Sequence, residues 1–405
     1  MSSAGSFAIP AAPRTRTAER VHSLDILRGF ALLGMILVHV HQFLERPGSG
    51  LEDLISWIIW VGVEQKSWAT FALLFGIGFA IQLRRLEAKG VRITPLYLRR
   101  LLGLALFGIV AYVGFGFRIL LDYAFWGVPL LFMRQWSTRS LLLAAILSAS
   151  AHSLIELGAG SHEWLTRGRA RADATAEARS AAAAQRRATL DSVQEHGSYG
   201  VLAGARVRAM RSDYLTWSFL IPGANLALFI MGYLALRHGV FDSPRRHIRM
   251  ILTAMTLGLL SWMVWWLVLR DLDLDLLPRR IASQLQNGLG IISEQWLAFF
   301  YVGLLVLWLA YRPAWERRLE LVGTAGRMAL TNYFIQIVIL DLLSSGYGLD
   351  LSVRPALVPL IAVLIFGVEV VLSRRWLARY RLGPLEWLWR WFTYGVRPSQ
   401  RAGLG

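Results

Sequence analysis

The sequence predicts an all-α polytopic membrane protein with about ten transmembrane helices and with both the N- and C-termini in the cytoplasm. Three observations support this class. Of the 405 residues, 55% are hydrophobic and 17% are charged, whereas soluble domains contain about 45–50% apolar and about 25% charged residues. The apolar residues gather in runs long enough to cross a bilayer. The basic residues gather in alternate short loops between these runs.

A spanning helix needs about twenty consecutive, mostly apolar residues. The first apolar run follows Arg14, Arg16 and Arg20 and is too long for the core of a signal peptide, so we expect a retained helix. Segment 54–63 is too short to span, and we expect an interfacial or re-entrant helix there. The ten candidate spans are 24–44, 67–83, 100–117, 119–133, 139–157, 216–236, 248–269, 293–311, 328–345 and 355–373.

The charges of the short loops give one consistent topology, because cytoplasmic loops collect Arg and Lys. Segments 84–100, 245–249 and 312–327 are rich in Arg, whereas 45–66 and 271–275 carry most of the nearby acids. Ten crossings with both ends in the cytoplasm satisfy every short loop. We therefore expect a multi-pass protein of the bacterial inner (plasma) membrane.

One long polar stretch interrupts the membrane segments. Residues 158–215 are rich in Ala, Arg and Gln, which favour helix, so we expect one or two helices outside the membrane. No apolar heptad is sustained there, which argues against a coiled coil. The predicted segments are a cytoplasmic tail (1–20), a first membrane half of about five helices (21–157), the extracytoplasmic segment (158–215), a second membrane half of about five helices (216–373) and a cytoplasmic amphipathic tail (374–405).

The first candidate helix carries polar side chains on one face. At about 100° per residue, Asp25, Arg28, His39 and Gln42 fall within a stripe roughly 100° wide, and His41 points elsewhere. Arg28 and His39 are about 16 Å apart along the axis. This face suits a substrate that spans the membrane interior, with His39 moving a proton. The structural alternative is that Asp25 and Arg28 pair to anchor the helix end, while His39 lies among the outer headgroups.

A second polar group begins the candidate helix 328–345. Thr331, Asn332, Tyr333 and Gln336 follow Arg327, and Asn332 and Gln336 share a helix face. These residues would either contact a substrate or form hydrogen bonds between helices.

Isolated charged residues give weaker indications. Arg99 and Arg100 open a candidate helix, where they would fix topology or meet an anionic lipid or a phosphate. We expect the single acids Asp122, Asp341 and Glu369 to be solvated at the membrane interface.

Several chemistries are not indicated. The chain has no cysteine, which excludes disulfides, thiolate metal ligands and cysteine nucleophiles. No spacing of His, Asp and Glu indicates a metal site, and no redox cofactor is indicated. The net charge of +17 comes mainly from arginines in the loops, so we expect membrane lipid rather than nucleic acid as a partner. The composition also allows a homo-oligomer.

Five sequence blocks, in order along nearly the whole chain, resemble a known family. They are RVHSLDILRGFALLGMILVHV (20–40), EQKSWATFALLFGIGFAIQLRR (64–85), RRLLGLALFG (99–108), GRMALTNYFIQ (326–336) with GYGLDL (346–351), and GPLEWLWRWFTYG (383–395). Together they resemble the YeiB-like family of bacterial inner-membrane proteins, which is catalogued largely as a domain of unknown function. The N-terminal block is also distantly similar to integral-membrane acyltransferases of the glucosaminide N-acetyltransferase type.

The distant resemblance implies that an acyl group passes from a cytoplasmic acyl-CoA, used as a substrate, to a hydroxyl or amine of a small-molecule or sugar acceptor on the far side. It makes His39 the candidate base or acyl carrier, with Asn332 or Tyr333 orienting the acceptor or steadying the oxyanion. It makes Arg28, Arg99 and Arg100 candidates for the coenzyme phosphates. The remaining polar residues of the two faces are expected to contact substrate, namely Asp25, Gln42, Gln336 and Arg327.

Two other functions remain open at this point. One is a transporter or flippase of a small metabolite or lipid-linked precursor, which predicts a central cavity and broken helices near the midplane. The sequence has few prolines in its apolar runs and no clear internal repeat. The other is a non-catalytic assembly or signalling partner whose working surface is segment 158–215.

Overall fold

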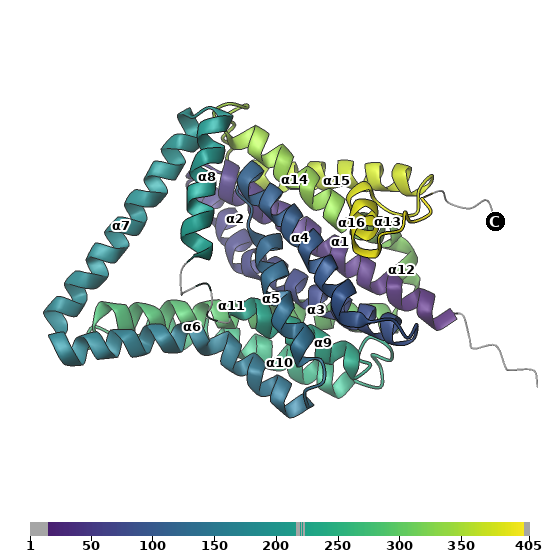
Figure 1. Ribbon diagram of the computed structural model, residues 1–405. Helices are drawn as coiled ribbons and strands as arrows, with labels where there is room; N and C mark the ends of the chain where they lie inside the picture. The colour runs from purple at the N-terminus through teal and green to yellow at the C-terminus, as the bar shows by residue number, and fades with distance from the viewer. Residues whose placement is uncertain (1–14, 216–218, 220, 222, 401–405) are drawn as a thin grey trace, which may run out of the picture.

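The computed structural model describes residues 15–400 except 216–218, 220 and 222, so Arg14 and residues 401–405 lie outside it. No β-strand occurs among the described residues, which form a helical bundle (Figure 1). The elements are α1 Thr15–Leu44, α2 Leu51–Ile59, the π-helical turn η1 Trp60–Glu64, α3 Gln65–Glu87, α4 Ile93–Phe115, α5 Ile119–Met133, α6 Thr138–Arg167, α7 Arg169–His196, α8 Tyr199–Tyr214, α9 Ala224–Arg237, α10 Ile248–Val264, the π-helical turn η3 Trp265–Leu269, α11 Arg279–Tyr311, α12 Ala314–Arg318, α13 Glu320–Arg327, α14 Ala329–Ser344, the 3-10 turn η4 Pro355–Leu357, α15 Val358–Leu377 and α16 Pro384–Tyr394.

The chain is a multi-pass membrane protein. Seven described helices are long and apolar enough to cross a membrane, or eight if the bent pair α13–α14 is one span. The other two candidates form α5 and α9, which have 15 and 14 residues. At 1.5 Å per residue these helices are about 21–23 Å long, shorter than the roughly 30 Å hydrocarbon core. Length and composition thus account for seven or eight crossings of the predicted ten.

The segment 54–63, expected to form an interfacial or re-entrant helix, is helical and continues directly into the next span. Residues 51–87 form one continuous 37-residue helical segment, in which η1 joins α2 to α3. A π-helical turn inserts an extra residue into the helix and changes which side chains share a face. The apolar run 54–63 is too short to span a membrane by itself, but it is part of a longer helical segment that includes α3.

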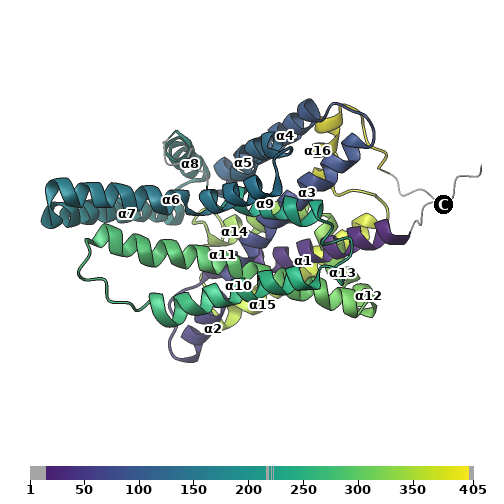
Figure 2. The same ribbon diagram turned by 90° about the horizontal axis from the view of Figure 1, so that it is seen from below.

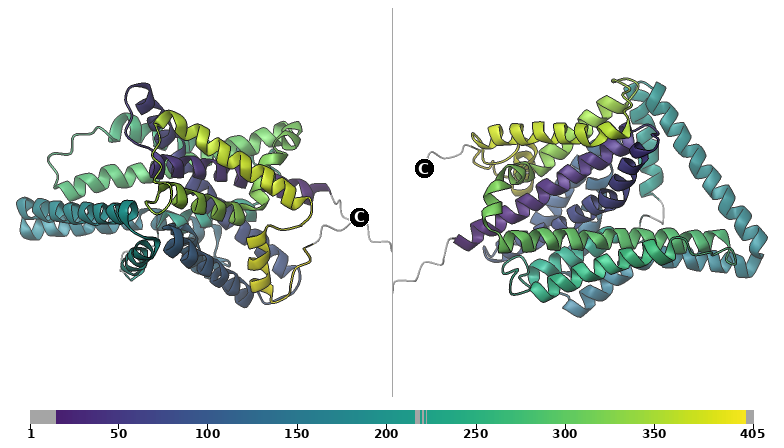
Figure 3. Two further views of the ribbon diagram at one scale, coloured as in Figure 1. Left: turned by 90° about the horizontal axis from the view of Figure 1, so that it is seen from above. Right: turned by 180° about the vertical axis from the view of Figure 1, so that it is seen from behind.

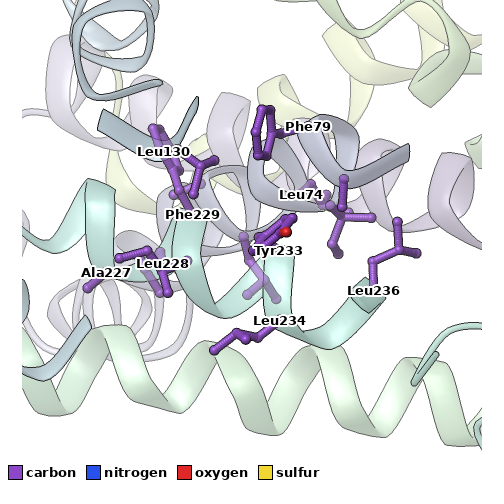
Figure 4. Close-up of a cluster of buried hydrophobic side chains, with 14 of the residues drawn as sticks. Leu74, Phe79, Leu130, Ala227, Leu228, Phe229, Tyr233, Leu234 and Leu236 are labelled. Carbon is purple, nitrogen blue, oxygen red and sulfur yellow. The ribbon is translucent and has the colours of Figure 1, made fainter. Parts of the chain in front are cut away.

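Helix α9 forms the centre of the larger hydrophobic core. Its side chains are buried along nearly its whole length, from Leu226 to Leu236, and Figure 4 shows them directed toward several neighbouring helices. Gly76 of α3 packs on the carbonyl of Phe229, and Gly232 packs on the carbonyl of Leu73. Because other helices surround α9, its apolar residues serve protein packing as well as the membrane, and a short helix suffices.

Helix α1 packs closely on the bent pair α13–α14, whose two parts meet at 82°. Gly29 lies against the carbonyl of Val322, and Gly326 lies against the carbonyl of Asp25. Small residues allow two helix backbones to approach, which is the main source of packing between helices in a membrane. This contact leaves the opposite face of α1 free to line cavities.

The loops with many arginines lie at one end of the bundle. The start of α1, α12 and α16 are found together there, as Figures 1 and 2 show from two directions. Side-chain contacts join these segments and their neighbouring loops: His22 with the carbonyl of Glu316 at 3.2 Å, Arg84 with Asp242 at 3.3 Å, and Arg99 with the carbonyl of Phe392 at 3.1 Å. The loops that the charge rule assigns to one side therefore share one end of the molecule.

Segment 158–215 is helical, as predicted, but it begins inside a longer helix. Helix α6 runs on from its apolar part and extends beside α11 past the bundle, and α7 returns obliquely to α8 (Figures 1 and 3). Arg280 of α11 binds Glu156 at 2.7 Å and Glu163 at 3.2 Å. These ion pairs join the last turns of α6 to the first turn of α11, near the turn into α7.

We predict that Gly326→Val weakens the bundle. A Cβ at Gly326 would overlap the carbonyl oxygen of Asp25, and overpacking costs about 1–3 kcal/mol or more when backbone must move. The midpoint of thermal unfolding in detergent should fall by several degrees.

Gly367→Val is the matched control, because a Cβ at Gly367 meets no atom within 4 Å. Equal unfolding midpoints for the two variants would contradict the proposed role of the α1–α13 contact.

Candidate functional site

A basic cavity of about 280 Å³ lies where α1, α3, α4, α5, α14 and α16 meet. Arg100 lies over the ring of Trp389, with its guanidinium carbon 4.1 Å from the ring centroid. The Tyr97 hydroxyl is buried and has no hydrogen-bond partner among the described residues. The cavity therefore offers several cations and an aromatic wall to an anionic ligand. Its four arginines are Arg28, Arg100, Arg327 and Arg390.

Glu386 of α16 fixes one wall of the basic cavity. Its carboxylate accepts hydrogen bonds from the backbone N–H groups of Leu330 at 2.7 Å and Thr331 at 3.1 Å, and from the Thr331 hydroxyl at 2.6 Å. These groups belong to the first turn of α14, so Glu386 caps that helix from a distance. Burial raises the pKa of the Glu386 carboxyl, although these hydrogen bonds oppose the shift. Part of the segment predicted as an amphipathic tail (374–405) thus also builds the cavity.

A second cavity, of about 380 Å³, surrounds His39 farther along α1, and we call it the histidine cavity. The His39 ring packs edge-on against Phe117, with ring centroids 4.8 Å apart, and its Nδ1 is buried without a partner among the described residues. Gln42 also lines the cavity and donates to Glu64 at 2.7 Å. The His39 ring therefore lines this cavity, and a neutral imidazole is a group that is able to take a proton.

Three side chains separate the two cavities. Met35, Ile119 and Tyr333 line both of them, and we call these three residues the septum. The Tyr333 hydroxyl is buried and has no partner among the described residues. The polar face predicted for α1 is therefore real, but the structure divides it into a basic end and a histidine end.

The other predicted residues of α14 face away from both cavities. Asn332 donates to the carbonyl of Ala325 and to the Ser373 hydroxyl, each at 3.0 Å. Gln336 donates to Glu369 at 3.0 Å and to the carbonyl of Leu32 at 3.3 Å. Both side chains are fully buried. They join α14 to α1, α13 and α15, which matches the interhelical alternative drawn from the sequence.

Two more predicted residues lie beside the basic cavity without lining it. Asp25 accepts from Arg28 at 2.7 Å and so positions that guanidinium. Arg99 is exposed and donates to the carbonyl of Phe392, so it anchors α16. Among the adjacent arginines, Arg100 is the one that lines the cavity.

Helix α8 covers the bundle next to the histidine cavity, away from the end that holds α12 and α16 (Figure 1). Arg206 binds Asp341 and the carbonyl of Gly114, each at 2.5 Å. Asp213 accepts from Tyr112 at 2.7 Å, and Tyr214 donates to Asp122 at 2.6 Å. Asp122 also lines the histidine cavity, so these contacts connect α8 directly with its rim.

The expectation that the three single acids are solvated is wrong. Asp341 is paired with Arg206, Asp122 binds Arg118 at 3.0 Å, and Glu369 is fully buried beside Gln336. Charged groups in a membrane protein are costly unless they pair or bond inside the protein. The partners of Asp341 and Glu369 come from distant segments, so sequence spacing gave no sign of them, whereas Arg118 lies one helical turn before Asp122.

Some residues that line the cavities were not predicted as site residues, although they lie next to or within segments that the sequence analysis singled out. Tyr97 stands two residues before Arg99, and Trp389 and Arg390 lie in the block 383–395. Glu64 sits at the end of η1 and lines the histidine cavity, whereas Lys66 faces α11 and pairs with Glu294 at 3.2 Å. The sequence did not show the π-helical turn, which changes the directions in which Glu64 and Lys66 point.

Sequence comparisons divide the chain into two matched parts. Residues 235–396 match the family described as Protein of unknown function (DUF418). Residues 20–166 match the family described as Heparan-alpha-glucosaminide N-acetyltransferase, catalytic. The second match contains most of α1, including Arg28 and His39, and it also contains Arg100. No solved structure matches the chain.

Three curated relatives are similar over nearly the whole chain. Uncharacterized protein YxaH of Bacillus subtilis is 27% identical, covering 94% of this chain and 96% of the relative. An uncharacterized 39.9 kDa protein in the amylase 3′ region of Bacillus acidopullulyticus is 26% identical, covering 93% and 94%. Uncharacterized protein YeiB of Escherichia coli is 26% identical, covering 93% and 96%. These matches confirm the resemblance to the YeiB-like family and its relation to the N-acetyltransferase.

We predict that Glu386→Ala loosens α16 and the first turn of α14. The variant loses three hydrogen bonds to that turn, and loss of a helix cap costs about 0.5–2 kcal/mol. Hydrogen–deuterium exchange should rise at residues 329–332 and 384–394.

Glu87→Ala removes an exposed carboxylate from the end of α3 and is the control. Unchanged exchange in both segments of Glu386→Ala would rule out the capping role.

Proposed function

We propose that this chain, similar throughout to YeiB-like proteins and in its N-terminal half to an N-acetyltransferase catalytic domain, is a membrane acyltransferase. It moves an acyl group from an acyl-CoA in the basic cavity to a hydroxyl or amine acceptor in the histidine cavity. The observation that carries this proposal is the meeting of the two cavities at Tyr333. One cavity has the charge for a polyphosphate donor, and the other has an unpaired imidazole.

In this proposal the chain crosses the inner membrane ten times, with α5 and α9 as short crossings and both termini in the cytoplasm. Support comes from the positive-inside rule, because the arginine-rich loops share the end that holds the basic cavity. The donor therefore enters from the cytoplasm, where acyl-CoA is made. The arm formed by α6, α7 and α8 then lies on the outer side.

The basic cavity suits the donor by charge. Arg28, Arg100, Arg327 and Arg390 would neutralise the phosphates, with Asp25 holding Arg28 in place. Arg28 and His39 are about 16 Å apart along α1, a separation that an extended pantetheine arm is able to bridge. The thioester would then lie at the septum, and only the acyl end would need to reach the histidine cavity.

The transfer step needs one base and one oxyanion donor. His39 takes the proton from the acceptor hydroxyl or amine while the acceptor atom bonds to the acyl carbon. The carbon–sulfur bond breaks, and the coenzyme thiolate leaves and then takes up a proton. The buried Tyr333 hydroxyl is placed at the septum to donate to the developing oxyanion. Gln42 would contact the acceptor, while Asn332 and Gln336 keep α14 in position.

A transporter is the second candidate, and one observation favours it. The bent pair α13–α14 is a broken helix beside a cavity, which is a common feature of transporter substrate sites. A transporter requires the whole septum to open for the solute. Acyl transfer requires only passage of the acyl end.

The first test is binding of acetyl-CoA to the purified protein in nanodiscs by titration calorimetry. We expect saturable binding that is at least tenfold weaker in Arg100→Gln, and unchanged in Arg92→Gln, an exposed arginine just before α4 that lies outside the cavity. His39→Ala should bind acetyl-CoA normally but lose acyl transfer and thioester hydrolysis.

The absence of binding at near-millimolar acetyl-CoA would overturn the proposal. Uptake of a solute into proteoliposomes without acyl transfer would favour the transporter. Equal activity of His39→Ala and wild type would remove the assigned base.

A second prediction isolates the hydroxyl at the septum. Tyr333→Phe keeps the shape of the septum and removes the proposed oxyanion donor. We expect kcat for acyl transfer to fall by about 10²–10³, with little change in the KM for acetyl-CoA. A raised KM with unchanged kcat would instead assign Tyr333 to donor binding.

A further inference from the structure

An apolar crevice of about 330 Å³ lies between α3, α6, α9, α10 and α11, and it shares no lining residue with the basic or histidine cavity. Only Thr138 and His238 among its lining residues are polar. The crevice enters the core rather than following the outside of the bundle, because several lining residues are buried core residues: Leu73, Leu234, Val240, Phe241, Ile251, Val302 and Val306.

One end of the crevice is polar and basic. Thr138 and His238 are 3.1 Å apart and form a hydrogen bond there. Arg139 follows Thr138 in the chain, and Arg249 precedes the lining residue Met250. Arg246 lies in the loop just before α10, and the side chains of all three arginines are exposed. Three exposed arginines therefore lie close to lining residues in the chain at this end of the crevice.

The neighbouring charges do not cancel this basic end. Asp242 in the same loop pairs with Arg84 at 3.3 Å, so its charge is already matched. Arg245 donates to the carbonyl of Ala310 at 3.0 Å and lies over the ring of Tyr311. These contacts hold the loop against α3 and α11.

The crevice is shorter than a complete lipid chain. Its lining residues on α11 run from Phe299 to Val306, which is about 10 Å along the helix axis. This length is about a third of the roughly 30 Å hydrocarbon core. The crevice can hold the part of an acyl chain nearest a headgroup, and the rest of the chain would continue into the bilayer.

We propose that this crevice binds one acyl chain of an acidic phospholipid, whose phosphate meets Arg139, Arg246 and Arg249. The apolar wall selects a hydrocarbon chain, and the three exposed guanidinium groups select a headgroup with net negative charge. We infer a lipid rather than a soluble ligand because the polar end and the apolar part belong to one continuous crevice. It does not depend on the acyl-transfer proposal.

The test compares lipid binding by native mass spectrometry of the full chain, titrated with phosphatidylglycerol and phosphatidylethanolamine of the same acyl chains. We expect wild type to prefer phosphatidylglycerol by about tenfold. Ala254→Leu fills the crevice and should weaken binding of both lipids at least fivefold. Leu142→Trp is a second filling variant at a lining position that is 40% exposed and tolerant of bulk.

Loss of the headgroup contacts is tested separately. The double variant Arg246→Gln and Arg249→Gln should lose the preference for phosphatidylglycerol while it still binds lipid. The matched controls are Gly367→Leu, at an open position on α15, and the double variant Arg374→Gln and Arg375→Gln at the exposed end of α15.

Two results would overturn the proposal. One is equal lipid binding by both filling variants and Gly367→Leu. The other is an unchanged preference for phosphatidylglycerol when Arg246 and Arg249 are replaced. Thermal unfolding of every variant separates loss of lipid from loss of fold.

Discussion

The close approach of α1 to the bent pair α13–α14 determines where everything else in the centre of this molecule lies. Gly29 and Gly326 allow backbone contact on one side of α1, and in a bilayer such contacts replace the hydrophobic driving force that water would provide. The other side of α1 is then free to carry Arg28, Met35 and His39 along one face. The 82° bend turns α14 so that Tyr333 faces the same space.

Much of this arrangement could be predicted from the sequence, because membrane segments and their loops follow simple rules. The polar face of α1 followed from helical periodicity, and the structure places both Arg28 and His39 in cavities. Periodicity could not show that Tyr333 and Asn332, adjacent in sequence, would serve different purposes. That difference depends on the helices that pack against each side of α14.

The unpredicted features share a physical cause, which is pairing between distant segments. Lys66 with Glu294, and Arg206 with Asp341, are buried ion pairs between helices far apart in the chain. Lipid offers no hydrogen bonds, so each such group must find a partner inside the protein. A single sequence shows that a charged residue lies in an apolar segment, but it does not show which distant residue pairs with it. The π-helical turn η1 could not be predicted either. Its extra residue changes the direction of Glu64, and no residue type in the segment indicates such a turn.

The thinness of the septum has an electrical consequence. Where water fills both cavities, most of the membrane voltage falls across Met35, Ile119 and Tyr333 rather than across the full bilayer. Moving one elementary charge through that layer takes roughly 2.3 kcal/mol per 100 mV. In the proposed transfer, a neutral acyl group would pass without electrical work, whereas a charged phosphate would not. The same three side chains would thus serve as an insulator that keeps the energised membrane from leaking ions while uncharged chemistry crosses it.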